Sequence, residues 1–299
     1  MSFSVLLGAL EQGLIYALVA LGIYVSYRIL DIADLTTDGT FALGAAVSAT
    51  LTVMGHPVLA IFAAIVSGAL AGGVTALLQT KLGVQPILAG IITMTALYSV
   101  NLMVMGNKPN LPMLKNDTIF TMIQMYLGDA GKIVLCAAIT LITAVALALF
   151  LKTQLGLSLR ATGNNRAMVA ASSINPSFTT TIGLCIANGI VALSGAILAQ
   201  YQRFSASDIG SGKVVLGLAS LIIGEVIFGR RGGVVRCILG AITGGIVYWL
   251  LMTLAMTSSI VSASNLKLVS AIIVAAAISY PTIKNALVLH KQRKAARNA

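Results

Sequence analysis

Charged side chains are scarce in this sequence. They make up 9% of its 299 residues, roughly a third of their share in an ordinary soluble domain. Hydrophobic residues make up 58% of the chain. The net charge of +11 is spread over the ends of apolar segments instead of being gathered on a polar domain, so it does not indicate a nucleic-acid partner. This composition is typical of a protein that crosses a membrane several times.

Cysteine and histidine are also rare, with three and two copies. Cys136, Cys185 and Cys237 stand alone within apolar segments and form no C-x-x-C pair, which indicates packing roles. His56 lies in a turn and His290 in a basic tail, both without other metal-ligating side chains nearby. The sequence therefore predicts neither a disulfide framework nor a metal centre.

Long apolar runs dominate the sequence instead. A helix needs about 20 apolar residues to cross a bilayer, and about nine segments approach that length. They are residues 4–27, 39–54, 58–80, 86–105, 132–151, 178–200, 214–228, 234–255 and 266–283. The second and seventh are short, so we expect broken or partly re-entrant helices there, covered by protein or water. The predicted fold class is an all-α polytopic membrane protein.

Basic residues predict how these segments are oriented. With the N-terminus outside and the C-terminus inside, most of them fall on the cytoplasmic side, as the positive-inside rule requires. The cytoplasmic set is Arg28, Lys81, Lys152, Arg160, Arg166, Arg230, Arg231, Arg236, Lys284 and the tail KQRKAAR. The outer set is Lys108, Lys115, Lys132, Arg203, Lys213 and Lys267. The first apolar run is too long for a signal peptide, so we expect it to remain as a span.

An internal repeat divides the chain. Four stretches recur in the same order, at an offset of roughly 172 to 180 residues. The pairs are VAL at 19–21 and 191–193, DLTTDGTFALGAA at 34–46 and DIGSGKVVLGLA at 208–219, GALAGGVTALL at 68–78 and GAITGGIVYWL at 240–250, and LAGIITMTALYS at 88–99 and LVSAIIVAAAIS at 268–279. An odd number of spans separates equivalent points, so the halves must have opposite orientations, as in many transporters. The small-residue pairs Gly68 with Gly72 and Gly240 with Gly244 predict close helix packing.

One polar interval, residues 153–176, joins the two halves on the predicted cytoplasmic face. It carries two arginines and three asparagines within TQLGLSLRATGNNRAMVAASSINP. The spacing of its apolar residues predicts a short amphipathic helix over 158–171, ended by Asn175 and Pro176. On composition alone, an ordinary cytoplasmic connector is the favoured explanation of the interval.

The run from Gly156 through Asn164 to Ile174 and Asn175, followed by GLCIANGIVALSGAILAQ and VVLGLASLIIGE, resembles the permease subunits of ABC importers of the branched-chain amino acid and ribose type. The resemblance covers nearly the whole chain and favours the branch paired with aromatic or other amino-acid binding proteins. It implies that the polar interval is a coupling helix that sits in a cleft of a cytoplasmic ATPase. The implied coupling residues are Ser158, Arg160, Thr162, Gly163, Asn164, Asn165, Arg166 and Met168.

The same resemblance implies a set of partners. Two copies of the permease would form a homodimer in membrane lipid, above ATPase subunits that bind ATP and magnesium, and beneath an extracytoplasmic substrate-binding protein. The chain itself is expected to bind no cofactor and to have no enzyme activity. Its GSGKVV at 210–215 is similar to a phosphate-binding loop, but Ser207 replaces the first glycine and Val214 the magnesium-binding hydroxyl.

Polar residues at membrane depth are candidates for the translocation path or its gate, because a charge at mid-bilayer costs about 2.5 to 3.5 kcal/mol on insertion scales. The candidates are Asp34, Asp38, Asn188, Ser194, Asp208, Lys213 and Glu225. Helix capping explains the three aspartates equally well. For Glu225, an ion pair with the nearby arginines or a neighbouring helix is favoured over substrate contact.

These observations predict one transmembrane domain over residues 1–290, with a basic cytoplasmic tail at 284–299. Repeat one covers 4–105 and repeat two 178–283, and the linking span and coupling loop cover 132–177. The predicted function is that of an ABC importer permease in a bacterial cell membrane, for an aromatic or branched-chain amino acid. A self-sufficient secondary transporter or channel is the alternative. It should carry an ion-coupling carboxylate near mid-span, whereas most carboxylates here lie at span ends.

Overall fold

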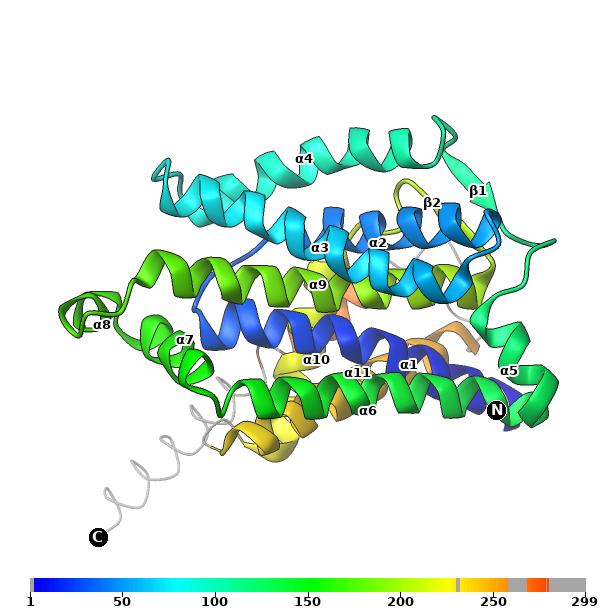
Figure 1. Cartoon of the computed structure of the whole chain (residues 1–299). Helices are drawn as coiled ribbons and strands as arrows, with labels where there is room; N and C mark the ends of the chain where they lie inside the picture. The colour runs from blue at the N-terminus through cyan, green and yellow to red at the C-terminus, as the bar shows by residue number, and fades with distance from the viewer. Residues whose placement is uncertain (1–2, 230–231, 258–267, 278, 280–299) are drawn as a thin grey trace, which may run out of the picture.

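A computed structural model describes residues 3–229, 232–257, 268–277 and 279. The chain folds into a bundle of long helices that run side by side, with short connections at both ends (Figure 1). The first elements are α1 (Phe3–Ile23), the π-helix η1 (Tyr24–Ile29), α2 (Thr36–Val53), α3 (Pro57–Thr80), α4 (Pro86–Val104), β1 (Asn110–Pro112), α5 (Ile119–Leu127), the 3₁₀-helix η2 (Gly128–Ala130) and α6 (Gly131–Phe150). The later elements are α7 (Gln154–Asn164), α8 (Arg166–Ala171), α9 (Pro176–Gln202), β2 (Phe204–Ala206), α10 (Lys213–Phe228) and α11 (Val234–Thr257). A short apolar helix, Leu268–Ala277, follows.

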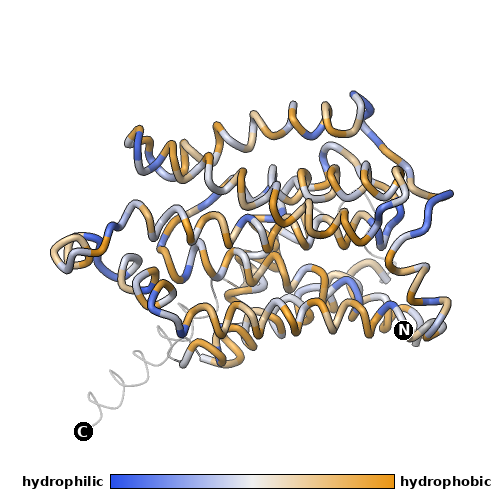
Figure 2. Tube along the Cα trace, viewed as in Figure 1, coloured by the Kyte–Doolittle hydropathy of each residue, from blue (hydrophilic) through white to orange (hydrophobic). Residues whose placement is uncertain are grey.

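Six helices of the described residues are long and apolar enough to cross a membrane. They are Ser4–Ile29, Pro57–Thr80, Pro86–Val104, Gly131–Phe150, Pro176–Gln202 and Val234–Thr257. Figure 2 shows apolar residues along the lengths of these helices, and hydrophilic residues mostly in the connections. The prediction of a polytopic helical membrane protein is confirmed.

The predicted second and seventh spans are the shorter helices α2, with 18 residues, and α10, with 16 residues. The predicted ninth span, 266–283, is described only at 268–277 and 279. Arg230, Arg231 and the basic tail at 284–299 lie outside the described residues.

Prolines mark where three of the spans begin. Pro57, Pro86 and Pro176 each occupy the first turn of a helix, where the missing N–H costs no hydrogen bond. Asn175 caps the last of these, because its Oδ1 accepts hydrogen bonds from the backbone N–H groups of Ser177 and Phe178 at 3.0 and 3.3 Å. The predicted end of the polar interval at Asn175 and Pro176 is confirmed.

The helices α1 and α9 form the buried centre of the bundle, whereas α4 and α6 are the least buried spans. The helix α9 packs against α3, α2 and α1, and α11 packs against α10 and α1. Glycines allow two of these contacts. A Cβ atom on Gly68 would lie 2.6 Å from the carbonyl oxygen of Asn188, and one on Gly244 would overlap the carbonyl oxygen of Ser220. The predicted close packing at these small-residue positions is confirmed.

Two details differ from the sequence-based expectations. A two-stranded antiparallel pair joins β1 to β2, with Asn110 opposite Ala206 and Pro112 opposite Phe204. The polar interval forms two helices, α7 and α8, where one helix over 158–171 was expected. Asn165 separates them because its backbone is extended, at φ −159° and ψ 100°, while its side chain accepts a hydrogen bond from the N–H of Met168.

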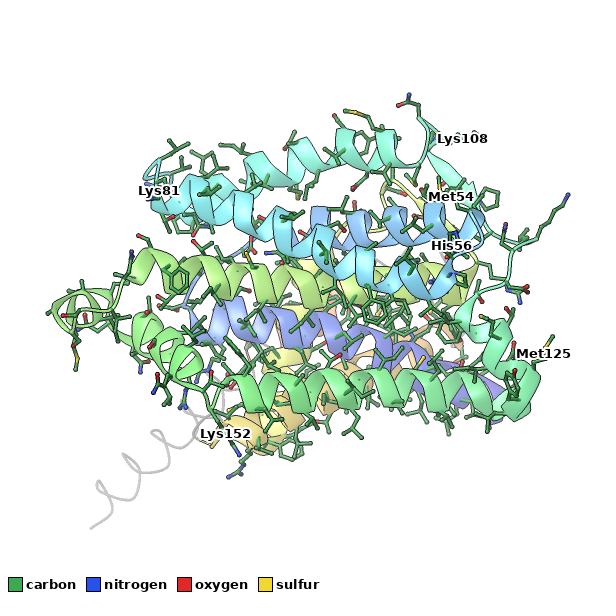
Figure 3. The ribbon with its side chains drawn as sticks, in the orientation of Figure 1. Met54, His56, Lys81, Lys108, Met125 and Lys152 are labelled. Carbon is green, nitrogen blue, oxygen red and sulfur yellow. The ribbon has the colours of Figure 1, made fainter. Side chains whose placement is uncertain are left out.

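The two ends of the bundle carry different features. Lys81 and Lys152 lie at the end that carries α7 and α8, and Lys108, His56 and Met125 lie at the opposite end (Figure 3). The helix α1 begins at the end of Lys108, so the polar interval and the start of the chain are on opposite sides of the bundle (Figure 1).

Candidate functional site

The first turns of α2 and α10 are in contact with each other. The Asp38 carboxylate, in the first turn of α2, accepts hydrogen bonds from the backbone N–H groups of Gly212 at 2.8 Å and Val214 at 2.7 Å. These N–H groups belong to the start of α10, where no intrahelical acceptor is available. Asp38 therefore caps the partner helix and ties the two short helices α2 and α10 together.

A second buried network links the segment before α2 to the middle of α9. The Asp34 carboxylate is 5% exposed and accepts hydrogen bonds from the Thr36 N–H at 2.9 Å and from the Asn188 side-chain amide at 2.7 Å. The Thr40 hydroxyl donates to the oxygen of the same amide at 2.7 Å. Asn188 is fully buried, so this network satisfies polar groups that neither water nor lipid can reach.

Lys213 is the first residue of α10 and lies against aromatic rings of other helices. Its ammonium donates a hydrogen bond to the Tyr16 hydroxyl at 3.1 Å. The same group is 4.7 Å from the centroid of the Tyr16 ring and 5.4 Å from that of Phe41, which are favourable cation–π distances. Trp249 of α11 stacks on Tyr16 with ring centroids 4.5 Å apart.

Two cavities flank the start of α10. The first, named here the Asp208 cavity, measures about 380 Å³ and lies between α2, α4 and residues 207–212. Tyr98 and Asn101 of α4 line it together with Asp208. Asn101 is 1% exposed, and its side-chain oxygen has no hydrogen-bond partner among the described residues. The Asp208 carboxylate is exposed and has no ion-pair partner in the described part of the chain.

The second cavity, named here the Lys213 cavity, measures about 480 Å³. Lys213 and Leu216 of α10, Tyr248, Trp249 and Met252 of α11, and Ser270 of the last described helix line it. Ser211 and Gly212 line both cavities, so they are adjacent. Their walls differ in chemistry, because the first has carboxylates and an amide and the second has an ammonium and aromatic rings.

The two remaining candidates join helices to one another. Glu225 of α10 forms an ion pair with Arg28 of η1, with oxygen and nitrogen 2.9 Å apart. This is the neighbouring-helix pair that the sequence favoured over substrate contact. Ser194 is fully buried and donates a hydrogen bond to the carbonyl oxygen of Ile15 at 2.7 Å, which ties α9 to α1.

The polar interval presents a surface at one end of the bundle. Five of its eight predicted coupling residues are exposed: Arg160, Asn164, Asn165, Arg166 and Met168. The other three lie closer to the bundle. The Thr162 hydroxyl lies 2.8 Å from that of Thr179, Gly163 contacts the carbonyl of Ile29, and Ser158 donates to the carbonyl of Gln154. The Arg166 guanidinium also donates to the Thr180 hydroxyl at 3.2 Å, so α8 is held against α9.

Comparison with known proteins identifies the family. Residues 5–278 match the model of the permease component of branched-chain amino acid transport systems. The chain belongs to this permease family. Its members are membrane components, so the described helical bundle is the fold of a permease.

Curated relatives agree with this assignment. The permease is 38% identical over 272 residues to the tyrosine transport system permease protein of Clostridioides difficile, covering 91% of this chain and 89% of the relative. It is 37% identical over 225 residues to an uncharacterized protein of Rickettsia prowazekii, covering 75% and 78%. It is 26% identical over 245 residues to the ribose import permease protein of Haemophilus influenzae, covering 80% and 75%. No solved structure matches the permease.

The structure of the permease brings some predicted residues together and separates others. Asp34 and Asn188 share one network, and Asp38, Asp208 and Lys213 surround the start of α10. Glu225 and Ser194 lie in separate helix contacts.

The sequence did not identify the aromatic residues that lie beside the start of α10 as candidates. Tyr16 and Trp249 belong to apolar spans that are far apart in the sequence, and both lie beside Lys213 in the structure. The one available signal was that Trp249 is the single tryptophan of the chain.

Proposed function

We propose that this permease is the membrane subunit of an ABC importer that transports an amino acid. The exposed α7–α8 surface carries this proposal, because it is a polar, basic platform at one end of an apolar bundle. Its anchored residues, such as Thr162, hold the platform against α9. A displacement of the platform would therefore be transmitted to this central helix. An ATPase docked there could therefore drive the bundle between conformations.

The partners follow from this role. The cytoplasmic ATPase subunits would bind ATP and magnesium, and this chain would hold no cofactor. A second copy of the permease would complete the path, and an extracytoplasmic binding protein would deliver the solute to the end that carries Lys108. Family membership supports ATPase and binding-protein partners in general terms.

An amino acid is the proposed solute because of the relatives. The C. difficile relative, at 38% identity, is named as a tyrosine transport permease, and the family description refers to branched-chain amino acids. The ribose import permease is a more distant relative, at 26% identity. We propose an aromatic or branched-chain amino acid as the substrate class.

The packing of the helices supports the proposed inverted repeat. The helix α3 packs against α9, and its proposed counterpart α11 packs against α1, the counterpart of α9. The glycine pairs that recur in the sequence lie at helix contacts in both halves. With Lys81, Lys152 and the α7–α8 platform at one end, the proposed orientation places that end in the cytoplasm and the start of α1 outside.

Co-purification tests the proposal. The permease is expressed with the ATPase encoded beside its gene, and the wild type is compared with a variant that carries Arg160→Glu and Asn164→Trp, both exposed on α7. The control variant carries Lys108→Glu and Met54→Trp, two exposed sites at the other end. We expect capture of the ATPase by the wild type and the control, and loss of capture by the α7 variant. Equal capture by all three would rule out this surface as the docking site.

One observation favours a second candidate, a self-sufficient secondary transporter. The buried Asp34 carboxylate contacts Asn188 near the middle of α9, where an ion-coupling group would be useful. Its hydrogen bonds to Thr36 and Asn188 give it a structural role instead. Solute uptake by the purified permease in liposomes under a proton gradient, without ATPase or ATP, would support this second candidate over the importer.

A further inference from the structure

Lys213 occupies a position where a positive charge is unfavourable. It is the first residue of α10, and a helix N-terminus already carries a partial positive charge. The Asp38 carboxylate lies at this N-terminus, but its oxygens are engaged by the N–H groups of Gly212 and Val214. A lysine at such a place in a membrane protein is costly to retain without a function.

The ammonium of Lys213 has unused hydrogen-bonding capacity. It carries three N–H donors, and the Tyr16 hydroxyl at 3.1 Å accepts one of them. Among the described residues no carboxylate lies within 4.0 Å of this ammonium. The rings of Tyr16 and Phe41 stabilise the charge from the side, but they accept no conventional hydrogen bond. Lys213 is therefore oriented by the protein, and in the described part of the chain the Asp38 carboxylate acts on it only from beyond 4.0 Å.

The cavity beside this ammonium has the size and walls of a small-molecule site. Its volume of about 480 Å³ falls within the range of pockets that bind small organic ligands. Trp249, Met252 and Leu216 supply apolar walls, and Tyr248 and Ser270 add hydroxyl groups. A ligand that fits must therefore combine one negative charge with an apolar or aromatic body.

We propose that the Lys213 cavity binds a small organic carboxylate with an apolar or aromatic body, and that the ammonium of Lys213 pairs with the carboxylate. The Tyr16 hydroxyl positions the ammonium, and Trp249 contacts the body of the ligand. An aromatic or branched-chain amino acid has this chemistry. The identification of the ligand as the transported solute rests on the proposed function, whereas the carboxylate site itself does not.

The fluorescence of the single tryptophan of the chain measures ligand binding directly. Trp249 lines the cavity, so its fluorescence in the full-length permease in liposomes reports binding there. Three probes separate the chemical contributions: 3-phenylpropionate has only the carboxylate, phenethylamine has only the amine, and L-phenylalanine has both. We expect saturable changes in emission with 3-phenylpropionate and L-phenylalanine, and no change with phenethylamine. A response to phenethylamine equal to that of the two carboxylates would overturn the proposal without any variant.

Variants test whether Lys213 binds the carboxylate of the ligand. Because a hydrogen bond to a charged group is lost, Lys213→Gln should weaken binding of both carboxylates about tenfold or more. Lys213→Arg should retain most of the affinity. Lys132→Gln is the matched control, since the Lys132 ammonium also lies over an aromatic ring, that of Tyr201, with 6.0 Å to the ring centroid. Unchanged carboxylate affinity in a folded Lys213→Gln variant would exclude the site.

ATP-driven uptake by the assembled importer separates this proposal from the proposed function. If the wild-type complex imports amino acids and Lys213→Gln imports them with unchanged KM and kcat, the carboxylate site is not on the path, although the importer stands. If the complex imports no amino acid while the fluorescence responds to carboxylates as expected, the site stands and the proposed substrate class is wrong.

Discussion

The buried network around Asn188 should be one of the main contributors to the stability of the bundle. In an Asn188→Ala variant, the Asp34 carboxylate loses the amide donor at 2.7 Å and keeps its contacts with Thr36, whose N–H lies at 2.9 Å. Because Asp34 is 5% exposed, water cannot easily replace the lost donor. Losing a buried hydrogen bond to a carboxylate costs about 1.5 to 3 kcal/mol. The same substitution also removes one acceptor of the Thr40 hydroxyl, which keeps the carbonyl oxygen of Thr36 at 2.9 Å.

A second buried residue of α9 supplies the matched control. Ser194 is as fully buried as Asn188, but its hydroxyl donates to the carbonyl oxygen of Ile15, which is neutral. Ser194→Ala should therefore cost only about 1 kcal/mol. Thermal unfolding in detergent, followed by size-exclusion chromatography of the heated protein, measures both variants. At about 2 °C per kcal/mol for a chain of this size, we expect Asn188→Ala to lower the Tm by roughly 3 to 6 °C, and Ser194→Ala by roughly 2 °C.

A double-mutant cycle completes the test. If Asn188 acts through the Asp34 carboxylate, the loss of stability in a variant with both Asp34→Ala and Asn188→Ala should be smaller than the sum of the two single losses. The reasoning is refuted if the two losses add, or if Asn188→Ala is no more destabilising than Ser194→Ala. Either result would mean that the amide and the carboxylate are energetically independent.

Two other contacts give simpler predictions. Gly244→Val should sharply reduce the yield of folded protein, because any Cβ there overlaps the carbonyl of Ser220. Gly233→Ala should leave the yield unchanged, since none of the described residues lies within 4 Å of a Cβ added there. Equal yields would contradict the close approach of α10 and α11. Glu225→Gln should lower stability by up to about 1 kcal/mol, less at high salt, because the partly exposed pair with Arg28 is screened. A loss that is independent of salt, measured by the same unfolding assay, would argue against that ion pair.

The amino-acid sequence by itself determined the class of this protein and much of its layout. Apolar runs of span length dictate membrane helices, because the backbone must satisfy its hydrogen bonds within each segment in lipid. Pro57, Pro86 and Pro176 mark helix starts, because that effect depends on the local chain alone. Gly68 and Gly244 mark a helix face that permits close packing, although the helix that packs there is set by the tertiary structure. The polar interval at 153–176 was recognisable because it separates two apolar segments.

Only the tertiary structure decided which polar groups meet. Asp38 caps α10 and not its own helix, Glu225 pairs with Arg28, and the ammonium of Lys213 lies beside Trp249. These partners lie on different helices, far apart in the sequence, and no helical periodicity relates them. Their distances depend on how each helix is rotated and on how far it slides against its neighbours. The packing of side chains across the whole bundle sets that geometry, and it is therefore absent from any single segment.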